Sequence, residues 1–382
     1  MNKKLGYYTC NGIEFESKIQ AAMVGEATNK PIKWHFNEST FNHYNWSQEP
    51  ELSLDQLYNK RAREIREKYD YVILSYSGGS DSNNVLESFL RQGLFIDEIV
   101  TNWALDLTDK FTILDPNEKS TWNHNAEFKL HTAGRLDYIK SKSPNTKITM
   151  IDTSKALVNG LLVNGDASWV NKKKEVLNLT GSSQYNYTYF SDIRKRFDKF
   201  QKIGLINGTD KPKVKIVDGK FYIYFIDKAV NMVSIQDHIT DYPNAEPVFF
   251  YWDPECCDML CKQGHTILKW VNANPHQKGI WKTNDPVIIR RVHEELLKTI
   301  VYPTTWNPSW FQVEKSIEDW DSELDYWFTR GWQGTQEYRI WKQGLDHVAS
   351  NIPSFLNYKP DGTVRGLKPC YSDTYFIGFT DI

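Results

Sequence analysis

Residues 69–92 are the part of the chain that most constrains its fold. Residues 71–76 form a short apolar run rich in β-favouring side chains, which predicts a buried strand. A Gly-Ser turn follows directly. Apolar side chains then recur at helical spacing, at Val85, Leu86, Phe89 and Leu90. A strand, a turn and a helix in this order predict the opening unit of an α/β fold.

The turn between strand and helix has the composition of an anion-binding loop. Its glycines let the backbone turn tightly and let a ligand approach it closely. The N–H groups of the following helix bind anions with help from the helix dipole, and serine hydroxyls add donors. The sequence lacks the lysine of the Walker loop GxxxxGK[ST] here, so we expect a phosphate held by backbone and hydroxyl groups. The alternative is an ordinary turn that caps the helix. The loop reads Ser77, Gly78, Gly79, Ser80, Asp81 and Ser82.

The hexapeptide SGGSDS after an apolar strand resembles the SGGxDS pyrophosphate loop (PP-loop) of the N-type ATP pyrophosphatases. That adenine nucleotide alpha hydrolase-like superfamily includes GMP synthetase, the synthetase domain of asparagine synthetase, tRNA thiolation enzymes and tRNA lysidine synthetase. The surrounding chain also looks like bacteriophage-encoded PP-loop and phosphoadenosine phosphosulfate reductase-like proteins. The motif itself covers the first βα unit, and the resemblance weakens beyond about residue 160.

The resemblance implies an enzyme that binds ATP and Mg²⁺ and forms AMP and pyrophosphate. In that superfamily the loop holds the β,γ-phosphates while an acceptor oxygen attacks the α-phosphorus. Ammonia, an amine or a sulfur donor then displaces AMP, which completes an amidation, ligation or thiolation. By this resemblance residues 77–82 would bind the pyrophosphate, and Asp81 would help to position Mg²⁺. The sequence does not name the acceptor, which is either a small molecule or a nucleic-acid base.

Two other functions fit part of the pattern. Sulfonucleotide reductases keep the fold without cleaving ATP, and they use a late cysteine within Glu-Cys-Gly-x-His. The late cysteine here is Cys370 in LKPCYSD, which does not match and counts against reduction. The other alternative is a nucleotide-binding module without turnover. Retention of the complete SGGSDS loop weighs mildly against it.

A second turn predicts further phosphate contacts. Residues 204–206 are a short apolar strand that ends in residues 207–211, NGTDK. Ligands of parallel sheets bind beyond the carboxyl ends of the strands, so this turn would bring its charges to the phosphates. Asp210 suits Mg²⁺, and Lys211 suits the charge that grows on pyrophosphate. The alternative is an ordinary β-turn, since Asn-Gly and Asp-x-Pro are common turn sequences.

Two more side chains are candidates for the nucleotide site. Trp103 follows the predicted strand 96–102, at the edge that commonly meets the adenine base in the resembling family. It would either stack on the base or pack in the core. Arg135 could reach a phosphate from the predicted helix 120–140, although a solvated helix face is the preferred interpretation. The other polar residues on that face are His124, Glu127 and His131.

The order of the predicted elements gives a doubly wound, mainly parallel sheet of Rossmann-like type. We expect an N-terminal extension over residues 1–68, with a β-hairpin at Asn11-Gly12 followed by helices. The PP-loop domain would span 69–227, and a mostly helical region would span 228–382. No regular pattern is recognisable over 227–253. Further predicted elements are strands at 147–151, 214–217 and 221–226 and helices at 53–68, 255–271, 286–299, 313–330 and 337–351.

Three cysteines and a histidine lie together in the predicted helix 255–271, which raises the question of a zinc site. Cys261 and His265 are four residues apart and could share a metal ion. Cys256 and Cys257 are adjacent and diverge by ~100° around a helix. Buried thiols in a helix–helix interface are therefore the preferred interpretation.

The composition limits the classes of protein to which the chain can belong. With 382 residues, 40% hydrophobic and 14% aromatic, the chain is predicted to be globular and larger than one typical domain. The net charge of −2 gives no overall attraction to nucleic acid. No apolar run approaches the ~20 residues of a membrane span, no signal peptide is recognisable, and the cysteines form no regular framework. We expect no membrane partner and a cytoplasmic location, in the host cytoplasm if the chain is phage-encoded. The oligomeric state is open, with a homodimer among the options.

Overall fold

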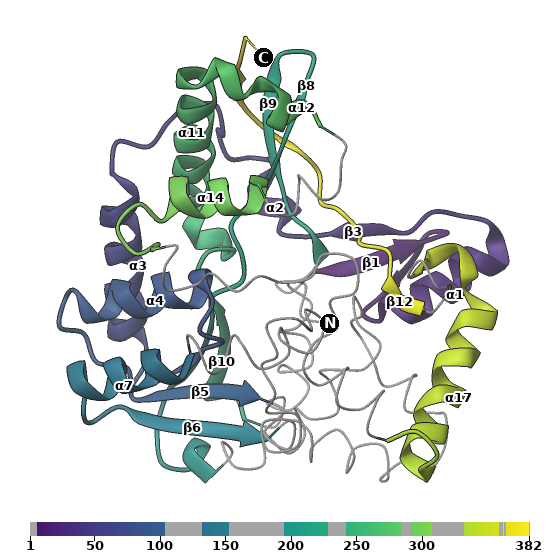
Figure 1. Ribbon diagram of the computed structural model, residues 1–382, viewed down its shortest axis with the longest axis horizontal. Helices are drawn as coiled ribbons and strands as arrows, with labels where there is room; N and C mark the ends of the chain where they lie inside the picture. The colour runs from purple at the N-terminus through teal and green to yellow at the C-terminus, as the bar shows by residue number, and fades with distance from the viewer. Residues whose placement is uncertain are drawn as a thin grey trace, which may run out of the picture.

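The computed structural model describes residues 6–103, 132–152, 195–227, 242–283, 292–307, 332–358, 362 and 364–381. Figure 1 shows a central sheet at lower left, and a small sheet at right with the helices α1 (Lys18–Thr28) and α17 (Gln336–Asn351). The hairpin β8 (Lys213–Val217) and β9 (Lys220–Tyr224) lies above the central sheet in the same view, beside the helix α11 (Cys257–Ala273). The candidate site is built on the central sheet.

All neighbouring strands of the five-stranded central sheet are parallel. The strand order is β10-β7-β4-β5-β6, so that β4, the first along the chain, lies between the second and the fourth. The chain therefore leaves β4 on one side and returns on the other, which makes a topological switch point between β4 and β7. The predicted α/β fold with a parallel sheet is confirmed. The strands are β4 (Tyr71–Ser75), β5 (Glu98–Trp103), β6 (Lys147–Asp152), β7 (Ile203–Asn207) and β10 (Ala245–Phe249).

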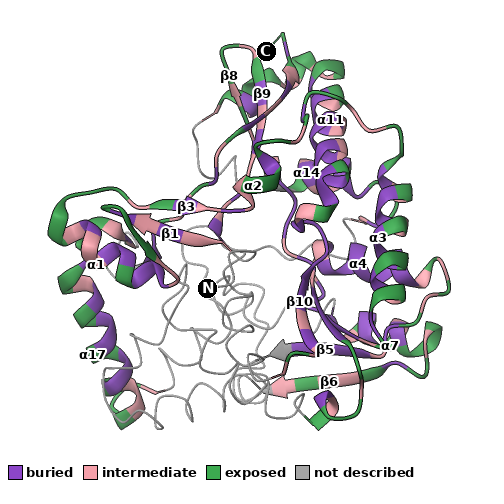
Figure 2. Ribbon diagram, turned by 180° about the vertical axis from the view of Figure 1, so that it is seen from behind, coloured by how far each residue is buried: buried purple, intermediate pink, exposed green. Residues whose placement is uncertain are grey.

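The sheet is covered on both faces, which explains why β4 is a continuous apolar run. Val72 and Leu74 pack into the main core, whereas Ile73, Val100 and Leu205 pack into a separate cluster on the opposite face. Full burial of such a side chain contributes about 1.5–3 kcal/mol to stability. Figure 2 shows buried residues concentrated along β10 and along α3 and α4 beside it.

Helices α3 (Leu54–Lys68), α4 (Ser80–Leu90) and α7 (Ala133–Lys142) accompany the sheet, and α3 packs against α4. Helix α3 begins with a capping box, in which the Ser53 side chain accepts from the N–H of Gln56 and the Gln56 side chain accepts from the N–H of Ser53. The helix predicted from the spacing of residues 53–68 is thus confirmed. Only the end of the helix predicted at 120–140 falls on α7, because residues 120–131 lie outside the described part of the chain.

The N-terminal residues form a small antiparallel sheet in the order β2-β1-β3. Asn11 and Gly12 both have positive φ and join β1 to β2 in the predicted hairpin. Helix α1 starts after Ser17, whose side chain accepts from the N–H of Gln20. The elements are β1 (Tyr7–Cys10), β2 (Ile13–Phe15), α1 (Lys18–Thr28), β3 (Lys33–His35) and α2 (Glu38–Phe41).

The later part of the chain adds both helices and strands. Helix α17 packs against α1, and β13 joins the hairpin β8–β9 in a sheet of order β13-β9-β8. Among the described residues no helix has the length and apolar character of a membrane span. The division of the chain into three regions stays a prediction. The elements are β8 (Lys213–Val217), β9 (Lys220–Tyr224), α11 (Cys257–Ala273), α12 (Lys278–Lys282), α14 (Glu294–Val301), α17 (Gln336–Asn351), β11 (Leu356–Tyr358), β12 (Val364–Leu367), β13 (Tyr375–Phe379) and 3₁₀ helices at Pro254–Cys256, Pro275–Gln277 and Pro353–Phe355.

Candidate functional site

The loop of residues 77–82 connects the carboxyl end of β4 to α4, at the switch point of the sheet. Gly78 has a backbone φ of +80°, and a Cβ at this position would lie 2.2 Å from Oγ1 of Thr132. The fold itself therefore requires glycine here. Gly79 differs, since its φ is −75° and a Cβ would contact Oγ of Ser77 at 3.3 Å. The part of the fold that the structure describes does not require glycine at position 79.

Hydroxyl groups hold the loop in shape around the start of α4. Oγ of Ser77 lies 3.3 Å from Oγ of Ser82 and accepts from the N–H of Gly79 at 3.3 Å. The N–H groups of Ser80, Asp81 and Ser82 belong to the first helical turn and have no helical carbonyl to reach. Donors at the positive end of a helix suit phosphate oxygens.

A second loop, residues 207–211 after β7, lies directly beside the first. A Cβ on Gly208 would be 3.1 Å from Cα of Ser82, so the two loops are in close contact. Oδ1 of Asn207 accepts from the N–H of Thr209 at 2.8 Å and fixes the turn. The close approach of the two loops places the charged end of the second one at the start of α4.

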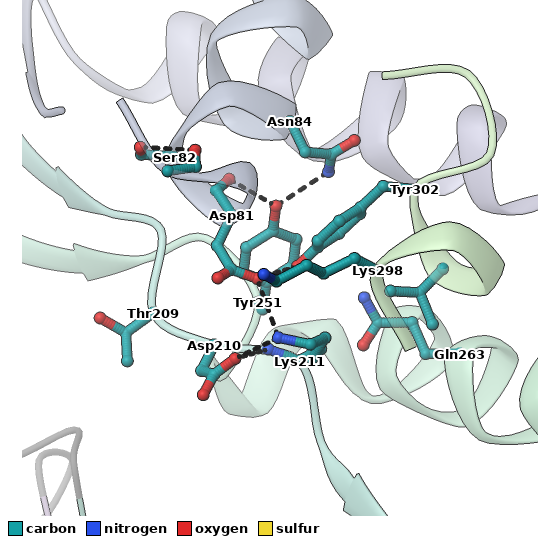
Figure 3. Close-up of polar contacts among 12 residues, drawn as sticks. Asp81, Ser82, Asn84, Thr209, Asp210, Lys211, Tyr251, Gln263, Lys298 and Tyr302 are labelled. Atoms are coloured by element: carbon teal, nitrogen blue, oxygen red, sulfur yellow. Dashed lines mark hydrogen bonds and ion pairs between the residues drawn. The ribbon is translucent and has the colours of Figure 1, made fainter. Parts of the chain in front are cut away.

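Three predicted site residues meet between these loops in one charge cluster (Figure 3). Nζ of Lys211 lies 3.1 Å from Oδ1 of Asp210 and 3.7 Å from Oδ1 of Asp81. Nζ of Lys213 lies 3.4 Å from Oδ2 of Asp210. The Lys211 side chain is 2% exposed, whereas that of Asp81 is 28% exposed. A buried ammonium thus faces a carboxylate that solvent and ligands can reach.

Asp81 is held from the other side by two tyrosines. The hydroxyl of Tyr302 donates to Oδ1 of Asp81 at 2.5 Å, and that of Tyr251 donates to its backbone carbonyl at 3.0 Å. Burial raises the pKa of the Asp81 carboxyl; Lys211 opposes this rise and Asp210 adds to it. Burial also raises the pKa of both tyrosines well above the usual value, so they remain donors. Oδ2 of Asp81 makes no hydrogen bond within the described part of the chain.

Sequence reasoning missed both tyrosines. Tyr251 follows β10, and recognition of residues 245–249 as a strand would have predicted it at this edge. Tyr302 follows α14 and reaches Asp81 across 221 positions of sequence. Nothing local in the sequence around Tyr302 indicates this contact.

Arg135 and Trp103 are not brought into the charge cluster by any described contact. Nη2 of Arg135 lies 2.6 Å from Oε1 of Glu87 and 2.8 Å from Oδ1 of Asn83, both on α4. Its guanidinium also lies over the ring of Tyr138, 4.2 Å from the centroid. These contacts tie α7 to α4, and the role of Arg135 at a phosphate stays a prediction. The side chain of Trp103 lies outside the described part, as do His124, Glu127 and His131.

The cysteine-rich segment forms no group of three metal-ligating side chains among the described residues. Sγ of Cys261 donates to the carbonyl of Trp46 at 3.3 Å, and Nε2 of His265 lies 3.1 Å from the same oxygen. Burial raises the pKa of Cys256, Cys257 and Cys261 to about 12, so these thiols are protonated at neutral pH. The thiols are buried, as the alternative to a zinc site predicts.

No model of a known protein family matches the sequence, and a comparison with curated proteins finds no significant relative. The chemistry of the site therefore rests on the residues themselves. They provide helix N–H donors, serine hydroxyls, one buried ammonium and two carboxylates, all at one edge of a parallel sheet. This set suits a phosphate chain with a divalent cation.

Proposed function

We propose that this chain is an ATP-dependent enzyme of PP-loop type. It binds ATP and Mg²⁺ at residues 77–82 and transfers the adenylyl group to an acceptor, with pyrophosphate as the other product. The observation that carries the proposal is the meeting of Asp81, Asp210 and Lys211 beside the start of α4, at the switch point between β4 and β7. Either loop alone would be compatible with an ordinary turn.

In this proposal, different groups of the site bind the pyrophosphate and stabilise its charge. The N–H groups of Ser80, Asp81 and Ser82 and the hydroxyl of Ser77 face the phosphate oxygens in this proposal. Lys211 stabilises the charge that develops as the bond to the α-phosphorus breaks. Its ammonium is already fixed by Asp210, so it requires little rearrangement in the transition state.

Asp81 and Asp210 are the residues that would hold Mg²⁺. The fit is supported by Oδ2 of Asp81, which has no hydrogen bond within the described residues, and by the 28% exposure of that side chain. Mg²⁺ in nucleotide sites commonly takes one or two carboxylates together with phosphate oxygens and water. The ion would neutralise charge on the phosphates.

The second half of the reaction concerns an acceptor that is a small molecule or a nucleic-acid base. Ammonia, an amine or a sulfur donor would displace AMP from it. Sulfonucleotide reduction has less support, because burial raises the pKa of the Cys370 thiol to about 11 and leaves little thiolate at neutral pH. The unpaired cysteines of the described residues fit a reducing compartment, so we place the protein in the cytoplasm, of the host if phage-encoded.

The test is turnover of ATP labelled at the α-phosphate, with Mg²⁺ and with metabolite extracts or RNA as acceptors. We expect acceptor-dependent AMP and pyrophosphate, reduced ~10²–10³-fold by Lys211→Met. Lys215→Met is the matched control, since Lys215 is exposed on β8, and it should leave the rate unchanged. ADP and phosphate as products would refute the proposal. Tight ATP binding with no product would favour the nucleotide-binding module.

A variant of the loop separates ligand contact from folding. Gly79→Ala adds a methyl group where the backbone would meet the phosphates, yet among the described residues it contacts only the Ser77 hydroxyl. We expect a small loss of stability, a few tenths of a kcal/mol, and a tenfold or greater loss of ATP affinity. Isothermal titration calorimetry and thermal unfolding measure the two effects separately. Unchanged affinity would show that ATP does not approach this backbone.

A further inference from the structure

A second polar cluster lies outside the nucleotide site, on the small N-terminal sheet. Oγ1 of Thr9 on β1 is 2.8 Å from Nε2 of His35 on β3. Nδ1 of the same ring is 2.8 Å from Oε2 of Glu38, the first residue of α2. A hydroxyl, an imidazole and a carboxylate thus form a continuous chain of hydrogen bonds. Hydrolytic triads have this arrangement.

The strand register explains how Thr9 and His35 meet. Tyr7 pairs with His35 and Thr9 pairs with Lys33, so all four side chains lie on one face of the antiparallel pair. The ring of Tyr7 stacks on that of His35, with centroids 4.8 Å apart and planes at 12°. The imidazole plane is therefore fixed by stacking as well as by its hydrogen bonds.

The Glu38 carboxylate determines which nitrogen of the neutral His35 ring carries the proton. An ionised carboxylate can only accept, so Nδ1 of a neutral His35 carries the proton that is donated to Glu38. Nε2 is then an acceptor, and the hydroxyl of Thr9 must donate to it. A general base that activates a nucleophilic hydroxyl needs this direction of donation.

The cluster is partly exposed to solvent, and a cation lies beside it. The side chains of His35 and Glu38 are 15% and 25% exposed, and Thr9 is half-buried. Lys33, the cross-strand neighbour of Thr9, is 52% exposed and lies 3.3 Å from Oε1 of Glu38. Nζ of Lys33 also lies 3.6 Å from Oδ1 of Asp373, so two carboxylates hold this cation beside the cluster.

We infer that Thr9, His35 and Glu38 form a second catalytic site, which accepts acyl groups from activated esters or thioesters of small carboxylic acids. Oγ1 of Thr9 attacks the carbonyl carbon while its proton passes to Nε2 of His35. The carbon–oxygen or carbon–sulfur bond to the leaving group then breaks, and the leaving group takes that proton. Water hydrolyses the Thr9 ester by the same route, which releases the acid. This activity does not depend on the nucleotide site.

The test uses the full chain with p-nitrophenyl acetate and, separately, a fluorophosphonate probe, followed by peptide mass mapping. We expect an adduct on Thr9 and release of p-nitrophenolate. Thr9→Ser should retain the activity, whereas Thr9→Val, which keeps the shape without the hydroxyl, should abolish the adduct. Glu38→Gln should slow labelling at least ~100-fold, because the carboxylate no longer fixes the tautomer. Thr28→Val on α1 is the matched control and should label like the wild type.

Two results would overturn the inference. One is the absence of any adduct on Thr9 in the wild-type protein under conditions where a serine hydrolase is labelled. The other is equal labelling of the wild type and of folded Glu38→Gln or Thr9→Val. In either case the contacts only hold β1, β3 and α2 together. Thermal midpoints establish which variants are folded, and if Thr9→Val unfolds, the mapping of the wild type and of Thr9→Ser still decides.

Discussion

Two buried lysine–aspartate clusters use the same chemistry in different surroundings. In the first, Lys18 of α1 pairs with Asp227, which follows β9, and the two side chains are 3% and 1% exposed. Asp227 also accepts from the hydroxyl of Tyr8 at 3.0 Å and from the N–H of Cys370 at 3.1 Å. Both carboxylate oxygens are therefore occupied, and the cluster is closed.

The second cluster joins Lys211 to Asp81 and Asp210, and it is open on one side. Lys211 is as buried as Lys18, but the Asp81 side chain keeps 28% of its surface exposed. The closed cluster links segments more than 200 positions apart, which is a structural role. The open cluster leaves a carboxylate oxygen for a ligand. The lysine is buried in both clusters, so its burial does not distinguish a structural role from a binding role. The difference is whether both oxygens of the partner carboxylate already have hydrogen-bond partners.

Breaking the closed cluster should give the largest loss of stability. Lys18→Met leaves Asp227 buried without its counter-charge, and we expect a loss of about 3–5 kcal/mol in urea unfolding. The double variant Lys18→Met/Asp227→Asn removes both charges and should recover most of this loss. A double variant that is no more stable than Lys18→Met would show that the packing of Lys18, not its charge, matters.

Replacing Gly78 tests how rigid the loop of residues 77–82 is beside the open cluster. Gly78→Ala combines a positive φ with a clash against Thr132, and we expect a loss of about 2–4 kcal/mol. Gly93→Ala is the matched control, since Gly93 has a φ of +66° but no described atom within 4 Å of its Cβ position. It should cost about 1–2 kcal/mol through the backbone alone. If both variants lost the same free energy of unfolding, in thermal or urea unfolding, the loop would be able to move away from Thr132 and avoid the clash.

Lys211→Met should destabilise the fold less than Lys18→Met does. In this variant Asp81 keeps its hydrogen bond from the Tyr302 hydroxyl and its access to solvent, and Asp210 keeps its ion pair with Lys213. Neither carboxylate therefore loses all of its polar partners. We expect the free energy of unfolding, measured in urea, to fall by about 1–2 kcal/mol, whereas turnover should fall ~10²–10³-fold. A loss as large as that of Lys18→Met would remove the distinction between the closed and open clusters.

The sequence predicted the loops of the open cluster but not the contacts that complete it. Apolar runs and helical spacing located β4, α3 and α4, because these signals are local. Glycine and turn chemistry located residues 77–82 and 207–211. The strand β10 was missed, because residues 227–253 show no regular pattern. It contains Pro247, which is tolerated at the edge of the sheet, where one side of the strand is unpaired. Because the strand was missed, Tyr251, which follows its carboxyl end, was missed with it.

The closed cluster was not predicted at all, and the reason is physical. Lys18 is the first residue of a helix and Asp227 follows a strand, and charged residues at such positions are typically exposed. Only the tertiary fold brings them together, across 209 positions of sequence. Charged residues whose partners are distant in sequence carry no periodic signal.

The smallest predicted effect is a pH dependence that belongs to the open cluster. Burial raises the pKa of Asp81 in the folded protein, whereas the unfolded carboxyl titrates at about 3.9. The folded state therefore binds this proton more tightly, so the group's contribution is fully present below about pH 4 and is lost as the pH rises through the folded pKa. Asp81→Asn should flatten this fall relative to the wild type in urea unfolding measured from acidic to neutral pH. Asp218→Asn, in the turn between β8 and β9, is the control that should follow the wild type. If wild-type stability instead rose with pH relative to Asp81→Asn, Lys211 would dominate over burial, and the carboxylate would already be ionised before any Mg²⁺ arrives.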